Sequence, residues 1–228
     1  MKAPGIGQTV VCALGLASVL LCFLSCTPKR AQTSAPEPPL AALTALPAPL
    51  PGDKTPGVIH VLEVLDLLSK YDRGGRIRSA QIIGFQFPEN EINEYLAYSL
   101  RMKPRPGISR AAVKLLPEND ISALIEIDFA ALREWNSWII PTLLQPLLNG
   151  RQTIEINAQF EAQDGVLHFV LQDAYGPGGA AILKTIGQDI IQSIGLHQPE
   201  WYDTSRPIPL PFGLRRVWTQ KQSIAGGT

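Results

Sequence analysis

The stretch ISRAAVKLLPENDISALIEIDF, residues 108–129, decides the fold class of this chain. In its second half the odd-numbered positions from Ile121 to Phe129 are apolar, and most positions between them are polar. This period of two is typical of a strand with one buried face. Pro117-Glu118-Asn119-Asp120 has the composition of a turn, so residues 108–116 and 121–129 are predicted to pair as a β-hairpin.

A second hairpin follows further along the chain. Residues 154–161 and 166–174 both alternate between apolar and polar side chains, and Asp164-Gly165 lies between them as a turn. Each hairpin is therefore expected to have one apolar and one polar face. That pattern suits an antiparallel sheet covered on one side by helices rather than a doubly wound parallel sheet.

Three segments around the hairpins have the apolar spacing of amphipathic helices, namely residues 58–71, 89–101 and 178–196. Residues 79–87 and 214–224 are predicted to be flanking strands. Residues 199–212 are rich in proline and are expected to be irregular. The predicted fold is α+β, with a curved antiparallel sheet of two hairpins plus flanking strands, wrapped around or covered by amphipathic helices in the order α-β-α-ββ-α-ββ-α-β.

Residues 132–149, LREWNSWIIPTLLQPLLN, form the most apolar part of the folded region. Pro141 and Pro146 interrupt a helical pattern and are expected to kink or break it. Packing in the core explains the composition, and so does a mobile apolar cover over a ligand cavity or a surface that touches a membrane or a partner. The candidate ligand-binding residues of such a cover are Trp135, Trp138, Ile140, Leu144 and Leu147.

The N-terminus indicates export. An apolar run at residues 10–24 follows Lys2 and is short for a membrane-spanning helix, so it is interpreted as a signal sequence. Ser25-Cys26 at its end resembles a bacterial lipobox, although Phe23 and Leu24 depart from the usual pattern. We favour a lipoprotein with Cys26 as the lipidated N-terminus, on the periplasmic face of a membrane, over an uncleaved anchor or a cleaved and secreted protein.

Residues 27–56 are dominated by proline and alanine and are predicted to be a disordered spacer after the leader at 1–26. A single α+β domain is then expected at 57–228. The three cysteines all lie within the leader, so the folded part has no thiol nucleophile, disulfide or thiolate metal ligand. Twenty Lys and Arg residues balance twenty Asp and Glu residues, which disfavours nucleic acid as a partner.

Side chains that could carry catalysis are scattered. His60, His168 and His197 fall in different predicted elements, so we expect no metal site and no cofactor. Glu89, Glu91 and Glu94 are interpreted as the acidic first turns of a helix, where negative charge favours the dipole. The glycine-rich run at residues 176–179 is interpreted as a turn that begins the 178–196 helix, not as a phosphate-binding loop. The chain is therefore predicted not to be an enzyme.

Two short segments and the hairpins between them resemble a known group of proteins. Residues 87–96 (FPENEINEYL) lead from a strand into a helix, and residues 210–214 (LPFGL) precede the last strand. In this order they are similar to small exported or lipidated bacterial domains of unknown function that resemble tubular lipid-binding (TULIP-like) proteins. The resemblance covers about residues 58–224, implies an elongated apolar groove between a helix and a curved sheet with lipid as ligand, and supplies no catalytic residues.

The leading functional hypothesis is a non-enzymatic domain that binds a lipid or another hydrophobic molecule at the cell envelope. The alternative is a structural or assembly module that binds an envelope protein partner through its tryptophan-rich segment. A third hypothesis is an enzyme whose catalytic groups converge from distant positions in the chain.

Overall fold

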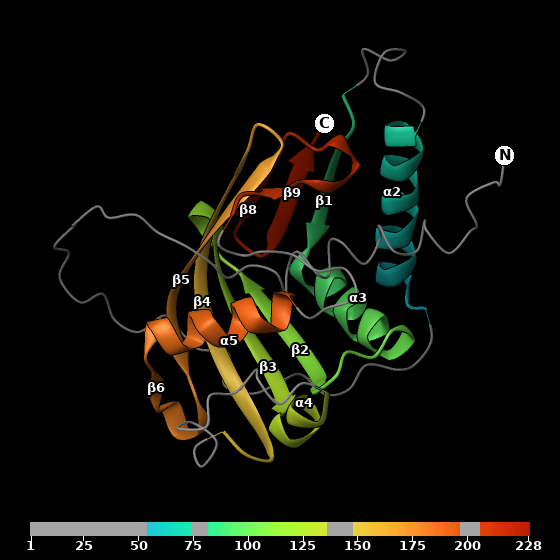
Figure 1. Cartoon of the computed structure of the whole chain (residues 1–228). Helices are drawn as coiled ribbons and strands as arrows, with labels where there is room; N and C mark the ends of the chain where they lie inside the picture. Colours follow the sequence, from blue (N-terminus) through green and yellow to red (C-terminus); the bar gives the residue numbers. More distant parts are fainter. Residues whose placement is uncertain (1–53, 74–81, 136–147, 197–205) are drawn as a thin grey trace, which may run out of the picture.

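The computed structural model describes residues 54–73, 82–135, 148–196 and 206–228, with four helices and nine strands in these ranges (Figure 1). The strand pairs are antiparallel and the sheet is open, so the predicted α+β fold with an antiparallel sheet is confirmed. The predicted leader and nearly all of the predicted spacer lie outside the described residues.

Both predicted hairpins and two of the predicted helices form close to their expected positions. In chain order the helices and strands are α2 (Pro56–Arg73), β1 (Gly84–Pro88), α3 (Glu89–Met102), β2 (Ile108–Leu115), β3 (Asp120–Asp128), α4 (Phe129–Trp135), β4 (Arg151–Gln163), β5 (Val166–Tyr175), β6 (Ala181–Ile182), α5 (Lys184–Leu196), β7 (Ile208–Pro209), β8 (Arg216–Gln220) and β9 (Ser223–Gly227). Short 3-10 turns occupy Pro117–Asn119, Pro177–Gly179 and Pro211–Gly213.

The longest strand, β4, organises the sheet. On one side it pairs with β5 from Glu155 to Gln163. On the other side it pairs with β3 from Arg151 to Gln159 and then with β8 at Ala162. The sheet therefore forks along β4 into a β3–β2 branch and a β8–β9–β1 branch (Figure 1).

Backbone and side-chain hydrogen bonds join the two branches where they meet. The backbone N–H of Glu89 donates to Gln222 O at 2.9 Å, and Gln222 N donates to Leu115 O at 3.1 Å. The Glu89 carboxylate accepts from Leu115 N at 2.7 Å, which closes a ring of three residues. Nearby, Thr219 N donates to Asn119 Oδ1 at 2.9 Å. These bonds satisfy polar groups that would otherwise lack partners at the fork.

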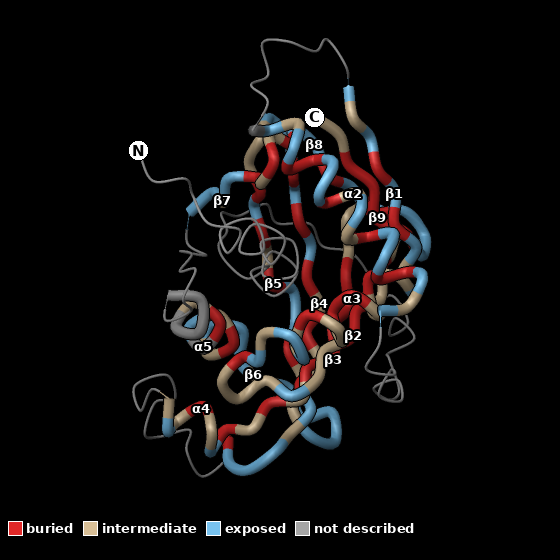
Figure 2. Tube along the Cα trace, turned by 90° about the vertical axis from the view of Figure 1, so that its right-hand side faces the viewer, coloured by how far each residue is buried: buried red, intermediate tan, exposed pale blue. Residues whose placement is uncertain are grey.

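The core lies on one face of the sheet, which we call the inner face. Along β4 the even-numbered side chains from Ile154 to Ala162 are all buried there, while the odd-numbered side chains lie on the opposite, outer face. Figure 2 shows the distribution of buried residues along the chain. α5 packs on β5, α4 contacts β3 and β4, and α2 packs on α3 and on the turn at Pro211–Gly213. This arrangement, with helices on one face of an antiparallel sheet, follows from the alternation in the sequence.

Helix α3 runs along the free edge of β2 and closes it with a side chain. Asn93 Nδ2 donates to Val113 O at 2.9 Å, and Val113 N donates to Asn93 Oδ1 at 2.7 Å. The amide therefore pairs with the strand as a neighbouring strand would. Covering an edge in this way removes a site at which another chain could pair.

The prediction of a helix at residues 178–196 is wrong for its first six residues. α5 begins at Lys184, and residues 176–182 instead form a tight turn and the short strand β6, which pairs with the end of β5. Gly178 and Gly179 have φ angles of 69° and 77°. These left-handed conformations are incompatible with a right-handed helix and are adopted readily by glycine.

The single strand predicted at residues 214–224 is also wrong, because the chain forms the hairpin β8–β9 there. Lys221 and Gln222 make the two-residue connection, with Gln222 at a φ of 61°. The last strand, SIAGG, was missed because two glycines disfavour a strand when judged from propensity alone. In the structure Phe85 of β1 lies against Gly226, so the space beside the glycine is filled by the neighbouring strand.

Candidate functional site

Most residues of the predicted site fall outside the described part of the chain. This applies to Cys26 and to the cover residues Trp138, Ile140, Leu144 and Leu147. Trp135 is the last residue of α4, where it is half-buried and packs against the hydrophobic core. The described apolar residues at the start of the 132–149 segment therefore pack in or against the hydrophobic core.

The inner face carries an apolar surface on its two central strands. In register, Ala123 lies opposite Ile156 and Ile125 lies opposite Ile154, with Ile127 next along β3. All five side chains are buried and belong to the hydrophobic core, and we call them the inner apolar floor. β2 and β5 lie on either side of these strands, and α3 and α5 contact those two outer strands (Figure 1).

Helix α5 packs closely on the sheet at a glycine. A Cβ on Gly187 would lie 3.2 Å from Leu171 Cδ2 and 3.6 Å from the Cβ of Ala174, both on β5. Ile191, one turn further along the helix, is buried, whereas Leu183 just before the helix is 70% exposed. The helix therefore packs on the β5 side of the inner apolar floor through a small residue that permits close contact.

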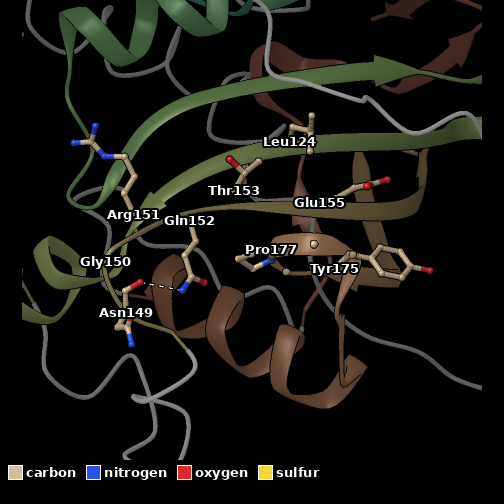
Figure 3. A pocket seen from close by; sticks show the side chains of 12 residues that line it. Leu124, Asn149, Gly150, Arg151, Gln152, Thr153, Glu155, Tyr175 and Pro177 are labelled. Carbon is tan, nitrogen blue, oxygen red and sulfur yellow. Dashed lines mark hydrogen bonds between the residues drawn. The ribbon is translucent and has the colours of Figure 1, made fainter.

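A hollow of about 690 Å³ opens on the outer face of the sheet (Figure 3). Leu124, Glu155 and Tyr175 lie side by side in it, because β3, β4 and β5 pair in that register. Thr153 lies two residues before Glu155 on the same face of β4. The remaining lining residues are Asn149, Gly150, Arg151, Gln152, Gly176, Pro177, Gly178 and Gly179.

One wall of this outer hollow is the turn that connects β5 to β6. Gly176 N donates to Ala180 O at 2.7 Å, which closes the turn, and the 3-10 turn at Pro177–Gly179 contacts β4. α5 begins at Lys184, so the glycines do not present the first backbone N–H groups of a helix. The interpretation of this run as the turn that begins the helix is therefore wrong, because β6 lies between the glycines and α5.

The charges around the outer hollow offset one another. Arg151 Nε lies 3.8 Å from Glu126 Oε1, and Arg110 Nη1 lies 4.0 Å from Glu126 Oε2. The Arg151 side chain is 64% exposed, so this contact contributes little to stability. Among the lining residues Arg151 and Glu155 are the charged side chains, one of each sign. The hollow therefore has no excess of either charge.

The outer face of β3 is more buried than its sequence predicts. Ser122 and Leu124 belong to the alternating set expected to be solvated, yet they are only 3% and 5% exposed. Ser122 Oγ is buried without a hydrogen-bond partner among the described residues. The expectation of one polar face on this hairpin is therefore wrong for the centre of β3. The leucine within the alternation was the sequence feature that could have indicated an apolar spot there.

The three glutamates of α3 have separate structural partners. Glu89 accepts the Leu115 N–H, Glu91 Oε2 lies 2.7 Å from His60 Nδ1, and Glu94 accepts the Thr55 hydroxyl. They tie α3 to β2 and to the beginning of α2 rather than converging on one point. Their interpretation as structural acids fits these contacts.

The described part of the chain holds no group of three or more His, Cys, Asp and Glu side chains placed to bind a metal ion. It also contains no helix with the length and apolar character needed to cross a membrane.

No protein-family model matches this chain, and neither does any curated protein or solved structure. The resemblance to tubular lipid-binding proteins therefore rests on the short sequence motifs and stays a prediction.

Proposed function

We propose that this chain is a non-enzymatic domain that binds a lipid or another hydrophobic molecule and is held at the bacterial cell envelope by its N-terminus. The observation that carries the proposal is the inner apolar floor, a continuous patch of alanine and isoleucine on the central strands β3 and β4. The helices α3 and α5 contact the strands to either side of it. An apolar molecule lying on this floor would need no polar partner from the protein.

The free energy of such binding is favourable for an acyl chain of ordinary length. Each methylene removed from water contributes about 0.8 kcal/mol, so an acyl chain of about a dozen carbons gives roughly 10 kcal/mol before the costs of ordering. Apolar contact alone therefore supports useful affinity. The leader, with Ser25-Cys26 at its end, and the proline-rich spacer after it support placement of the domain near a membrane.

The first test is mass spectrometry of organic extracts from the full chain purified in detergent. A control protein of similar size is carried through the same detergent and extraction steps. We expect a lipid to be retained in stoichiometric amount. Recovery of a stoichiometric protein partner in place of lipid would favour the assembly module instead.

Two alanine substitutions on the inner face distinguish a ligand space from a packed core. Ala123 on β3 belongs to the inner apolar floor and is 8% exposed. Ala158 lies on β4, also on the inner face but outside the floor, and is fully buried. We expect Ala123→Leu to fill ligand space, weakening binding of a fluorescent fatty acid while leaving the unfolding midpoint nearly unchanged. Ala158→Leu overpacks the core and should destabilise the domain by about 1–3 kcal/mol.

The paired design makes the result decisive. If Ala123→Leu destabilises the domain as strongly as Ala158→Leu and the extracts hold no lipid, the floor is ordinary core and the proposed function is wrong.

A further inference from the structure

The outer hollow lies on the face of the sheet opposite the inner apolar floor, so it requires an explanation of its own. Its central row of Leu124, Glu155 and Tyr175 comes from three neighbouring strands, and the Gly176–Gly179 turn forms its wall (Figure 3). A lipid chain does not suit it, because much of its lining is polar. The ligand must be one that offers both polar and apolar contacts at an open surface.

The charges of the outer hollow exclude strongly charged ligands. Arg151 is the cation of the lining, and its guanidinium lies 3.8 Å from Glu126. A phosphate or polyanion would meet one cation that already has an acidic neighbour, with Glu155 close by. A polycation would meet one carboxylate and the same arginine. Since neither sign is in excess, a neutral ligand is favoured.

The hydrogen-bonding groups of the hollow are of the kinds that pair with hydroxyl groups. Glu155 supplies carboxylate acceptors, Arg151 supplies guanidinium donors, and the hydroxyls of Thr153 and Tyr175 can both donate and accept. The ring of the half-buried Tyr175 adds apolar surface within the same row. A sugar ring presents hydroxyls along its edge and C–H groups on its faces, and it matches this combination.

We propose that the outer hollow binds a neutral carbohydrate chain. Binding at this surface would let the domain hold a polysaccharide of the envelope while its inner face serves another purpose. An extended peptide fits less well, because the 3-10 turn at Pro177–Gly179 contacts β4 and obstructs the line along which a strand would be added.

The test uses three neutral trisaccharides, cellotriose, chitotriose and maltotriose, titrated by calorimetry into the full chain in detergent micelles. Glu155→Gln keeps the shape of the side chain and removes its charge. We expect it to weaken binding of the preferred sugar about ten-fold, as is typical for loss of a hydrogen bond to a charged group. Tyr175→Phe should weaken binding by a smaller factor, because the lost hydroxyl is neutral.

Glu161→Gln is the matched control. Glu161 lies on the same strand and the same outer face, beyond the hollow and opposite His168, so its substitution should leave sugar binding unchanged. Parallel titrations with inorganic phosphate and with a neutral tetrapeptide should show no binding.

Three outcomes overturn the proposal. One is the absence of binding by all three sugars at millimolar concentration, and another is an equal effect of Glu155→Gln and Glu161→Gln. The third is binding of phosphate or of the tetrapeptide at the hollow in preference to the sugars.

Discussion

The side chain of Asn93 is predicted to stabilise the domain strongly for a polar residue on a helix. Its amide accepts from Val113 N at 2.7 Å and donates to Val113 O at 2.9 Å, so one side chain pairs both backbone groups of a residue that is itself 3% exposed. Asn93→Ala removes both bonds. It also uncovers the edge of β2, at which another chain could then pair.

The size of the effect follows from the groups left behind. A partly buried backbone donor or acceptor that loses its partner costs about 1–3 kcal/mol, so two such losses lower the free energy of unfolding by about 2–6 kcal/mol. At roughly 3 °C per kcal/mol for a domain of this size, the unfolding midpoint should fall by about 6–18 °C. Asn93→Asp keeps the acceptor and loses the donor, so its free energy of unfolding should lie between those of the parent protein and Asn93→Ala.

Asn90→Ala provides the matched control, because Asn90 lies on the same helix and is exposed. The same side chain is removed in both variants, and urea unfolding followed by circular dichroism compares them directly. Sedimentation velocity measures whether Asn93→Ala self-associates. If Asn93→Ala and Asn90→Ala unfold within about 0.5 kcal/mol of each other, the pairing of the β2 edge contributes nothing and the reasoning is refuted.

Three further changes test other parts of the structure. Gly226→Ala should destabilise the domain by about 1–3 kcal/mol in urea unfolding, because its Cβ would lie 2.6 Å from Phe85 Cζ and 2.9 Å from Arg216 O. Gly84→Ala is the control and should be tolerated, because its Cβ would lie 3.7 Å from the nearest atom. Burial, with Glu118 nearby, raises the pKa of Asp120, so its ionised form disfavours the folded state and Asp120→Asn should stabilise the domain slightly at neutral pH. That gain should vanish as the pH falls below the ordinary carboxyl range, where both states are protonated, and a gain that persists there would contradict the assignment. Cys26→Ala should abolish incorporation of labelled fatty acid into the protein, and equal labelling of the variant would rule out lipidation at this residue.

The two central hairpins could be predicted from the sequence because each strand there alternates over many residues and a turn lies between them. α3 was predicted from its helical spacing of apolar residues, and its buried residues Ile92, Tyr95, Leu96 and Ser99 recur every three or four positions. Local patterns decided these elements. By contrast, β6 has two residues and is held by pairing with the end of β5, and β9 contains two glycines and is held by pairing with β8 and with the distant β1. Neither segment carries a comparable pattern.

The outer hollow could not be predicted because a bulge changes the alternation of β5. Leu167, Phe169 and Leu171 lie on the inner face, and strict alternation would place Tyr175 there as well. The register with β4 shifts between Asn157 and Ala158, which inserts one residue into β5. Ala174 therefore becomes the next inner residue and Tyr175 moves to the outer face beside Glu155. Bulges are known to re-aim side chains in this way, and nothing in the sequence near Gln172 marks this one.

The strand β4 belongs to both proposed sites, and its alternation separates them. Ile154 and Ile156 contribute to the inner apolar floor, while Thr153 and Glu155 line the outer hollow. Because neighbouring residues of a strand point to opposite faces, a substitution such as Glu155→Gln changes the hollow without touching the floor. Binding of a sugar and binding of a lipid should therefore respond to different variants. If one variant abolished both, the strand itself would have been disrupted, and neither proposal could be judged from it without the unfolding measurement that accompanies each titration.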